Sequence, residues 1–104
     1  MRIDIDQTLQ EMIAAAEEAF GKGWKRIKDP AQNMIHGQRE RFEMLSQMRT
    51  EGLLSEEEFA YRLQEQKDIL QANLEALEVR GQVLAQNAAN AAIKVFEKAV
   101  STLL

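Results

Sequence analysis

The fold of this chain is decided by one stretch near its midpoint, Met48-Arg49-Thr50-Glu51-Gly52-Leu53-Leu54-Ser55-Glu56-Glu57-Glu58-Phe59. Gly52 suits the left-handed position that follows the end of a helix, where Leu53 can contact Met48 in a Schellman stop. Ser55 and Glu58 have the spacing of a capping box, which starts a new helix. The stretch therefore predicts a turn over residues 52–55 between two helices.

The composition indicates an all-α protein. Residues that favour helices dominate, whereas β-branched and aromatic residues are too few and too scattered for strands. A single Pro and five Gly in 104 residues leave little material for further turns. A chain of this length forms one domain, so we predict a single helical domain over residues 1–104.

Apolar residues recur in an eleven-residue rhythm on both sides of the Gly52 turn, which is typical of nearly straight paired helices. Before the turn the rows are Leu9, Phe20, Ala31 and Phe42; Ile13, Trp24 and Ile35; and Ala16 and Ile27. After it the stripe is Phe59, Leu63, Leu70, Leu74, Leu77, Leu84, Ala88, Ala92, Val95, Ala99 and Leu103. Because the first pattern keeps its phase across Pro30, we expect a kink or an interruption there and not a reversal.

These patterns predict a long antiparallel helical hairpin. Its parts are a short tail over residues 1–6, helices over about residues 7–28 and 30–51, the turn, and a helix over about residues 56–102. Thr8 and Glu11 have capping-box spacing near the start of the first helix. The last helix would be roughly 70 Å long, and the two termini would meet at the end opposite Gly52. A three-helix bundle that reverses near Pro30 is the alternative.

A hairpin of two helices leaves apolar surface uncovered. Residues 83–104 are apolar nearly all round, and a helix of that kind is normally buried on every side. We therefore expect the open end of the hairpin to complete a four-helix bundle by dimerisation. The residues expected at this interface are Leu9, Ile13, Phe20, Trp24, Leu84, Ile93, Phe96 and Val100.

Residues 45–70 resemble SHOCT, a short helical oligomerisation module. The resemblance lies in Gly52-Leu53-Leu54-Ser55-Glu56-Glu57-Glu58-Phe59 and in Lys67-Asp68-Ile69-Leu70. Both join a helix that ends in glycine to an acidic, capped helix. What the resemblance implies is assembly and not catalysis.

No pattern of catalytic or metal-binding residues stands out. His36 and Glu40 could share a helix face, but one histidine and no cysteine are too few for a zinc or di-iron site. The serines lack a second histidine that would activate them as nucleophiles; they are Ser46, Ser55 and Ser101. We therefore predict that the protein is not an enzyme and holds no metal or cofactor.

The charge of the chain argues against a nucleic-acid partner. Thirteen basic and seventeen acidic residues give a net charge of -4, whereas phosphate backbones attract basic surfaces. The local exception is a basic cluster, Lys22, Lys25, Arg26 and Lys28. We interpret it as a set of cations that meet the negative end of a helix dipole, and the neighbouring Gly21 and Gly23 as sites of close helix packing.

The start of the chain bears on its location. Asp4 and Asp6 interrupt the region where a secretory signal needs an apolar run. No stretch is long and apolar enough for a transmembrane segment. We expect a cytoplasmic protein.

The predicted function is that of a non-catalytic helical self-assembly or adaptor protein that acts through an apolar interface. A homodimer is the first expectation, and a protein hetero-partner would satisfy the same surface. An alternative is a helical bundle that binds a hydrophobic small molecule or lipid. A weaker alternative is a nucleic-acid-associated regulator that uses the basic cluster.

Overall fold

The computed structural model describes residues 2–78 and 81–104, and it forms five α-helices with no strand in those two ranges. The helices are α1 (Ile5–Phe20), α2 (Trp24–Gly37), α3 (Arg39–Thr50), α4 (Glu56–Leu77) and α5 (Gln82–Ser101). The all-α prediction is therefore confirmed.

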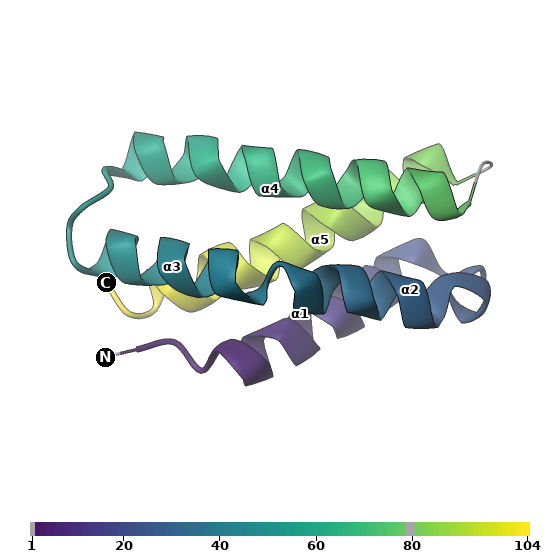
Figure 1. The fold of residues 1–104 in the computed structure, drawn as a ribbon, viewed down its shortest axis with the longest axis horizontal. Coiled ribbons are helices and arrows are strands. Elements are labelled where there is room, and N and C mark those ends of the chain that lie inside the picture. Colours follow the sequence, from purple (N-terminus) through teal and green to yellow (C-terminus); the bar gives the residue numbers. More distant parts are fainter. Residues whose placement is uncertain (1, 79–80) are drawn as a thin grey trace.

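The helices run back and forth along one axis (Figure 1). α2 and α3 follow one another nearly end to end, while α1, the α2–α3 pair, α4 and α5 alternate in direction. The longest dimension is 40 Å and the radius of gyration is 13.3 Å, close to the roughly 13 Å of a globular domain of this length. A rod of 70 Å does not fit these dimensions, so the expectation of an extended hairpin is corrected.

The first reversal lies at Gly21 and not near Pro30. Gly21 has φ 86° and ψ -152°, a conformation open in practice to glycine alone. Its N–H donates to the Glu17 carbonyl over 3.0 Å, and its own carbonyl accepts from the Trp24 N–H over 3.0 Å. The predicted helix over residues 7–28 is therefore two antiparallel helices, and α2 runs through Pro30.

The interruption of the second rod falls between α2 and α3. Gln38 separates the two helices, with φ -93° and ψ 3°, and α3 begins at Arg39. The predicted break near Pro30 is therefore displaced by two turns of helix. Pro30 itself lies on the exposed side of α2.

The second missed reversal divides the long helix predicted over residues 56–102. α4 ends at Leu77, Glu78 is extended with φ -140° and ψ 102°, and Gly81 caps the start of α5. A Cβ at Gly81 would lie 3.2 Å from the Glu78 carbonyl oxygen, a tighter contact than most side chains make, so a larger residue there would need a small shift of its neighbours. The predicted helix also crossed residues 79 and 80, which lie outside the described ranges.

The Gly52 turn has the geometry that its sequence indicates. Gly52 has φ 77°, the Leu53 N–H donates to the Met48 carbonyl over 2.8 Å, and the Gly52 N–H donates to the Arg49 carbonyl over 3.2 Å. These are the two bonds of a Schellman stop. The Leu53 side chain remains largely exposed, and Leu54 is the leucine of this turn that enters the core. The turn lies at the same end of the molecule as the start of α1 and the end of α5 (Figure 1), because the extra reversals bring the termini back to it.

The capping box of α4 is also present. The Glu58 carboxylate accepts from the Ser55 N–H over 3.0 Å, and the Ser55 hydroxyl accepts from the Glu58 N–H over 3.1 Å. The bond from the Ser55 backbone, followed by that from its side chain, lowers the pKa of Glu58 below its ordinary value of 4.5.

This pKa shift predicts how acid affects stability. A carboxylate whose pKa is lower in the folded chain stabilises the fold above the unfolded-state pKa, and that contribution is lost as the pH falls through the folded-state pKa. We expect Glu58→Gln to be less stable than the parent chain at neutral pH, with the difference shrinking below pH 4.5. Urea unfolding at a series of pH values measures both curves. A constant difference at every pH would contradict the prediction.

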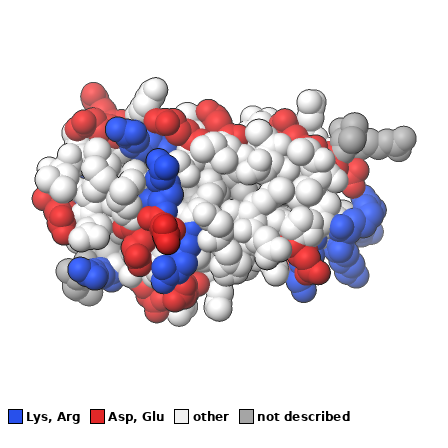
Figure 2. All heavy atoms as spheres, in the orientation of Figure 1, with Lys and Arg blue, Asp and Glu red and all other residues white. Residues whose placement is uncertain are grey.

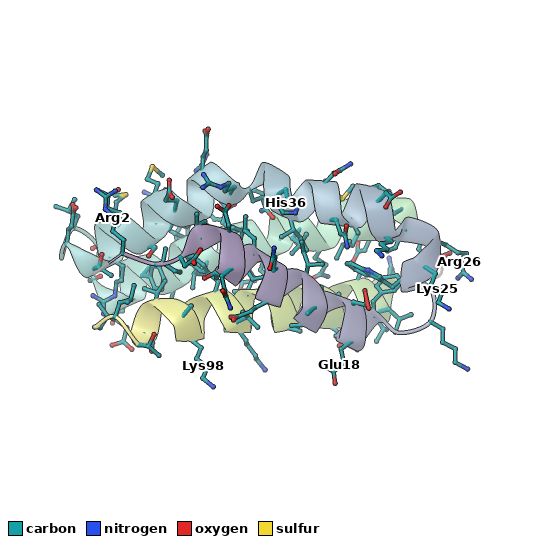
Figure 3. The ribbon with its side chains drawn as sticks, turned by 90° about the horizontal axis from the view of Figure 1, so that it is seen from below. Arg2, Glu18, Lys25, Arg26, His36 and Lys98 are labelled. Carbon is teal, nitrogen blue, oxygen red and sulfur yellow. The ribbon has the colours of Figure 1, made fainter. Side chains whose placement is uncertain are left out.

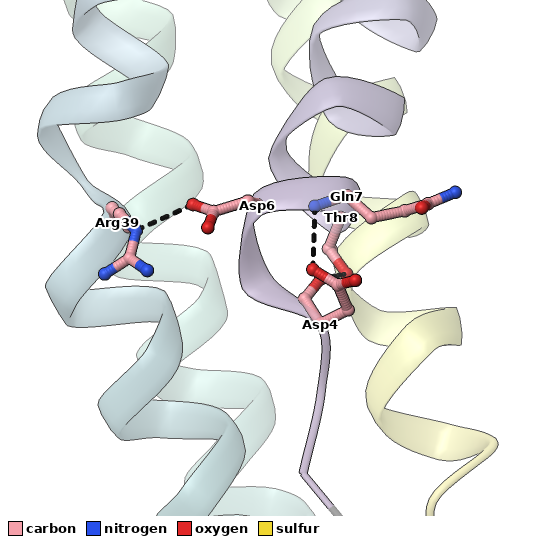
Figure 4. Close-up of polar contacts among 5 residues, drawn as sticks. All are labelled: Asp4, Asp6, Gln7, Thr8 and Arg39. Carbon is pink, nitrogen blue, oxygen red and sulfur yellow. Dashed lines mark hydrogen bonds and ion pairs between the residues drawn. The ribbon is translucent and has the colours of Figure 1, made fainter.

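The start of α1 is capped by Asp4, one turn before the predicted Thr8 cap (Figure 4). The Asp4 carboxylate accepts from the Gln7 N–H over 3.1 Å, and the Thr8 hydroxyl donates to the Asp4 carbonyl over 2.8 Å. Asp6 pairs with Arg39 of α3 over 2.9 Å, and the hydrogen bond from Arg39 lowers the pKa of Asp6. The predicted tail over residues 1–6 is correspondingly shorter, since α1 begins at Ile5.

The core has two kinds of packing. α1 and α5 are the most closely associated pair of helices. The two helices together hold five fully buried alanines, which are Ala16, Ala85, Ala88, Ala89 and Ala92. The sequence predicted these two segments to be neighbours. Between α3, α4 and α5 the core is aromatic: the ring centroid of Phe96 lies 4.8 Å from that of Phe42 and 6.2 Å from that of Phe59.

The eleven-residue rows locate the core of the first half of the chain correctly, since all their members are buried. On α5 the last stripe is correct only in part. Two of its members, Ala88 and Ala92, are fully buried, whereas Leu84 is exposed and Val95, Ala99 and Leu103 are half-buried. The other buried residues of α5 lie outside the stripe; they are Ala85, Ala89, Ile93, Phe96 and Val100. α5 begins afresh at Gly81, so the phase of α4 does not continue into it.

Candidate functional site

The interface predicted at the open end of a hairpin is covered by the chain itself. Seven of its eight residues are buried within the described chain: Leu9, Ile13, Phe20, Trp24, Ile93, Phe96 and Val100. Leu84, the eighth, is 38% exposed. The expectation of an uncovered apolar end is therefore corrected, because the reversals at Gly21 and Gly81 supply the layers that two rods would lack.

The remaining exposed apolar surface lies largely elsewhere. The large apolar side chains with substantial exposure are Met44, Leu53, Tyr61, Ile69, Val83, Leu84 and Leu104. Four of these belong to α3, to the Gly52 turn and to α4. They belong to α3, α4 and the turn that joins these two helices. We therefore take the exposed surface of α3 and α4 as the candidate site.

α4 has apolar residues on two faces. Its buried face holds Phe59, Leu63, Gln66, Leu70 and Leu74. On the other side, at steps of three and four, lies what we call the outer stripe of α4, which comprises Tyr61, Glu65, Ile69, Ala72 and Ala76. Tyr61 is 68% exposed and Ile69 is 49% exposed. A soluble helix with one apolar face turned to water is typical of a partner-binding element.

A groove runs beside the outer stripe, between α3 and α4. Its volume is about 180 Å³, and its lining consists of Arg41, Met44, Leu45, Met48, Leu54, Arg62, Glu65 and Gln66. The methionines give the groove an apolar and adaptable surface. Arg62 and Glu65 also border a shallower pocket with Tyr61, Glu57 and Glu58. The groove and the outer stripe therefore form one continuous patch.

Both signs of charge occur on this patch. Figure 2 shows a column of basic side chains that crosses from α4 to α3, with acidic side chains among them and at the upper and lower edges of this face. Among the residues that the structure describes, ion pairs join Arg26 to Glu78 and Arg39 to Asp6. Arg62 and Glu65 are exposed and form no ion pair within the described part of the chain. Arg62 lies near Glu58 and adds to the lowering of the pKa of that carboxylate, after the larger effect of the Ser55 hydrogen bonds.

A buried polar contact fixes α4 behind the patch. The Gln38 amide group donates to the side-chain oxygen of Gln66 over 3.1 Å and to its backbone carbonyl over 3.3 Å. Gln66 is a polar residue on the core side of α4, where it is buried between Leu63 and Leu70. This contact ties the junction of α2 and α3 to the middle of α4, and no sequence pattern pointed to it.

The basic cluster lies at the other end of the molecule, around the α1–α2 turn (Figure 3). Lys22, Lys25, Arg26 and Lys28 are all exposed. Arg26 pairs with Glu78, just beyond the end of α4, over 3.1 Å. Lys22 follows the end of α1, as the dipole interpretation requires, whereas Lys25, Arg26 and Lys28 lie in the first turns of α2, at the positive end of its dipole.

His36 and Glu40 are both exposed, on α2 and α3. No group of three or more potential metal ligands is found among residues 2–78 and 81–104. Five surface pockets, with volumes between about 180 and 530 Å³, are each lined in part by charged side chains. None of the described helices combines the length and the apolar character required to cross a bilayer.

Comparisons of the chain with protein-family models, with curated proteins and with solved structures found no match.

Proposed function

We propose that this protein is a non-catalytic helical self-assembly module that acts through the outer stripe of α4 and the adjoining groove. The observation that carries the proposal is the presence of Tyr61 and Ile69 on the exposed face of a helix whose opposite face already fills the core. Aromatic and branched side chains on one exposed helical stripe are typical anchors of protein interfaces.

Two further features support this proposal. The patch joins an apolar groove to charges of both signs, as expected of a surface that binds a copy of itself. The SHOCT resemblance over residues 45–70 covers the same turn and most of α4, and what it implies is assembly. A hetero-partner helix of similar character would use the same patch.

The proposal predicts self-association that depends on concentration. Sedimentation of the purified chain over a roughly hundredfold range of concentration should show a shift from monomer to dimer. We expect Tyr61→Asp and Ile69→Asp to abolish that shift, because each puts a charge into the apolar contact, while urea unfolding stays within about 0.5 kcal/mol of the parent chain.

Val83→Asp is the matched control, since Val83 is as exposed as Tyr61 but lies on α5 and belongs neither to the outer stripe nor to the groove. It should associate as the parent chain does. A parent chain that stays monomeric throughout the range would reject the proposed function, and equal loss in all three variants would place the interface elsewhere.

A further inference from the structure

We propose that a pocket between α3 and the two ends of the chain binds a small zwitterion with an aliphatic side chain, such as a free α-amino acid. The pocket lies on the opposite side of α3 from Met44 and Met48, which line the groove beside α4. The inference therefore does not depend on self-association through the patch.

The walls of the pocket come from distant parts of the sequence. Its volume is about 340 Å³, near the lower end of the roughly 300–1,000 Å³ that is typical of small-molecule sites. One wall is a polar stripe of α3 at steps of three and four residues, which consists of Glu43, Ser46, Gln47 and Thr50. Arg2 and Ile3 before α1, together with Leu103 after α5, form the facing wall. Figure 1 shows both chain ends beside the end of α3.

The pocket holds charges of both signs that do not pair with each other. Arg2 borders it from one wall, and Glu43 and Glu51 border it from the other. Within residues 2–78 and 81–104, no ion pair joins Arg2 to either carboxylate. Figure 3 shows the Arg2 side chain on the side of the N-terminal segment that faces α3, away from Lys98. The space between these charges suits a ligand whose carboxylate meets the guanidinium and whose ammonium meets the carboxylates.

Both carboxylates have neighbours that leave their charge in place. The Gln47 amide group donates to the Glu51 carboxylate over 3.1 Å, which orients that carboxylate without neutralising it. Glu43 lies near Arg39, whose Nε instead donates to Asp6 over 2.9 Å. The Asp6 hydrogen bond is the main cause of the raised pKa of Arg39, and Glu43 is a smaller one. Glu43 is thus exposed and without an ion pair in the described part of the chain.

The rest of the lining favours an aliphatic group beside the charges. Ile3 and Leu103 are apolar and half-buried, so a ligand side chain in contact with them would remove apolar surface from water. Ser46 is only 2% exposed, so the stripe of α3 reaches from the surface into the molecule. The ligand class is therefore an aliphatic amino acid, with leucine as the probe.

An NMR titration of the ¹⁵N-labelled chain with leucine tests the site. The amide signals of Glu43, Ser46, Gln47 and Thr50 should shift and saturate, while those of Tyr61 on α4 stay in place. We expect millimolar affinity, because the ligand has few atoms. The amine 3-methylbutylamine lacks the carboxylate and 4-methylpentanoate lacks the ammonium, so each should bind about tenfold more weakly than leucine.

Two variants test the roles of the charges. Arg2→Gln should weaken leucine about tenfold and leave the amine unaffected, and Glu43→Gln should weaken leucine about tenfold and leave 4-methylpentanoate unaffected. Glu40→Gln is the matched control, since Glu40 also lies on α3 and contributes to the raised pKa of Arg39 but does not line the pocket. Circular dichroism checks that each variant keeps its helical content.

Three results would overturn the inference. One is the absence of saturable shifts at the stripe of α3 with millimolar leucine. Another is binding of the amine or of 4-methylpentanoate as tightly as leucine, which would remove the case for a zwitterion. The third is an equal effect of Glu40→Gln and Glu43→Gln, which would mean that the ligand does not meet Glu43 in the pocket.

Discussion

Phe96→Ala is expected to lower the free energy of unfolding by about 3–5 kcal/mol, the cost of removing a fully buried aromatic side chain. Phe96 is 0% exposed and stands between Phe42 and Phe59, so its loss leaves a cavity bordered by α3 and α4. A small domain has a total stability of about 5–15 kcal/mol. The variant should therefore retain only a small part of its stability.

Urea unfolding followed by circular dichroism measures this loss. Val83→Ala is the control, because it also truncates an apolar side chain of α5 but one that is 68% exposed. It should change stability by less than about 0.5 kcal/mol. Similar losses in the two variants would mean that Phe96 does not lie in the core of the single chain.

Ala16→Leu should have the second largest effect, a loss of about 1–3 kcal/mol from overpacking. Ala16 is fully buried on α1, in the helix pair that packs most closely. Added methyl groups there can be accommodated only if α1 moves away from α5, which loosens every other alanine contact between them. The expected result is a lower urea midpoint.

Ala14→Leu provides the matched control on the same helix, because Ala14 is exposed. Its substitution exchanges the same residue types without touching the α1–α5 contact, so the midpoint should stay nearly unchanged. If Ala16→Leu were harmless, α1 and α5 would have to be separated by more space than their buried alanines indicate.

Local signals explain which turns could be predicted. Near Gly52, a few neighbouring residues form both the end of α3 and the start of α4. Backbone hydrogen bonds end α3, and the Ser55 and Glu58 side chains cap α4. Gly21 ends α1, and the helices that follow the two missed turns start at Gly23 and Gly81 without any side-chain cap. A glycine alone is compatible with a helix interior, so those two positions did not identify themselves as turns.

Pro30 has a stronger local signal for a helix break than Gly21 does, but the break occurs at Gly21. Proline has a known cost inside a helix, yet α2 runs through it and the chain reverses nine residues earlier, at Gly21. The eleven-residue rhythm still found the buried rows of the first half, because α1 and α2 each turn an apolar side to the same core. Periodicity located core residues better than it located helix ends.

The candidate site shows the reverse situation. The excess of apolar residues near the C-terminus suggested a partner, but α5 buries most of them against α1, α3 and α4. Tyr61 and Ile69 were available in the sequence as a pair eight residues apart, on the opposite side from Phe59 and Leu63. These two residues can be recognised as an exposed pair only when the bounds of α4 and its buried face are known.

The contact between α1 and α5 also has a consequence for how the chain is made. α1 finds its main neighbour in α5, which is synthesised only after α2, α3 and α4. The buried side of α1 therefore cannot be covered in the native way until α5 has emerged from the ribosome. Contacts between segments so far apart in the sequence also slow folding, because the loop between them must close first.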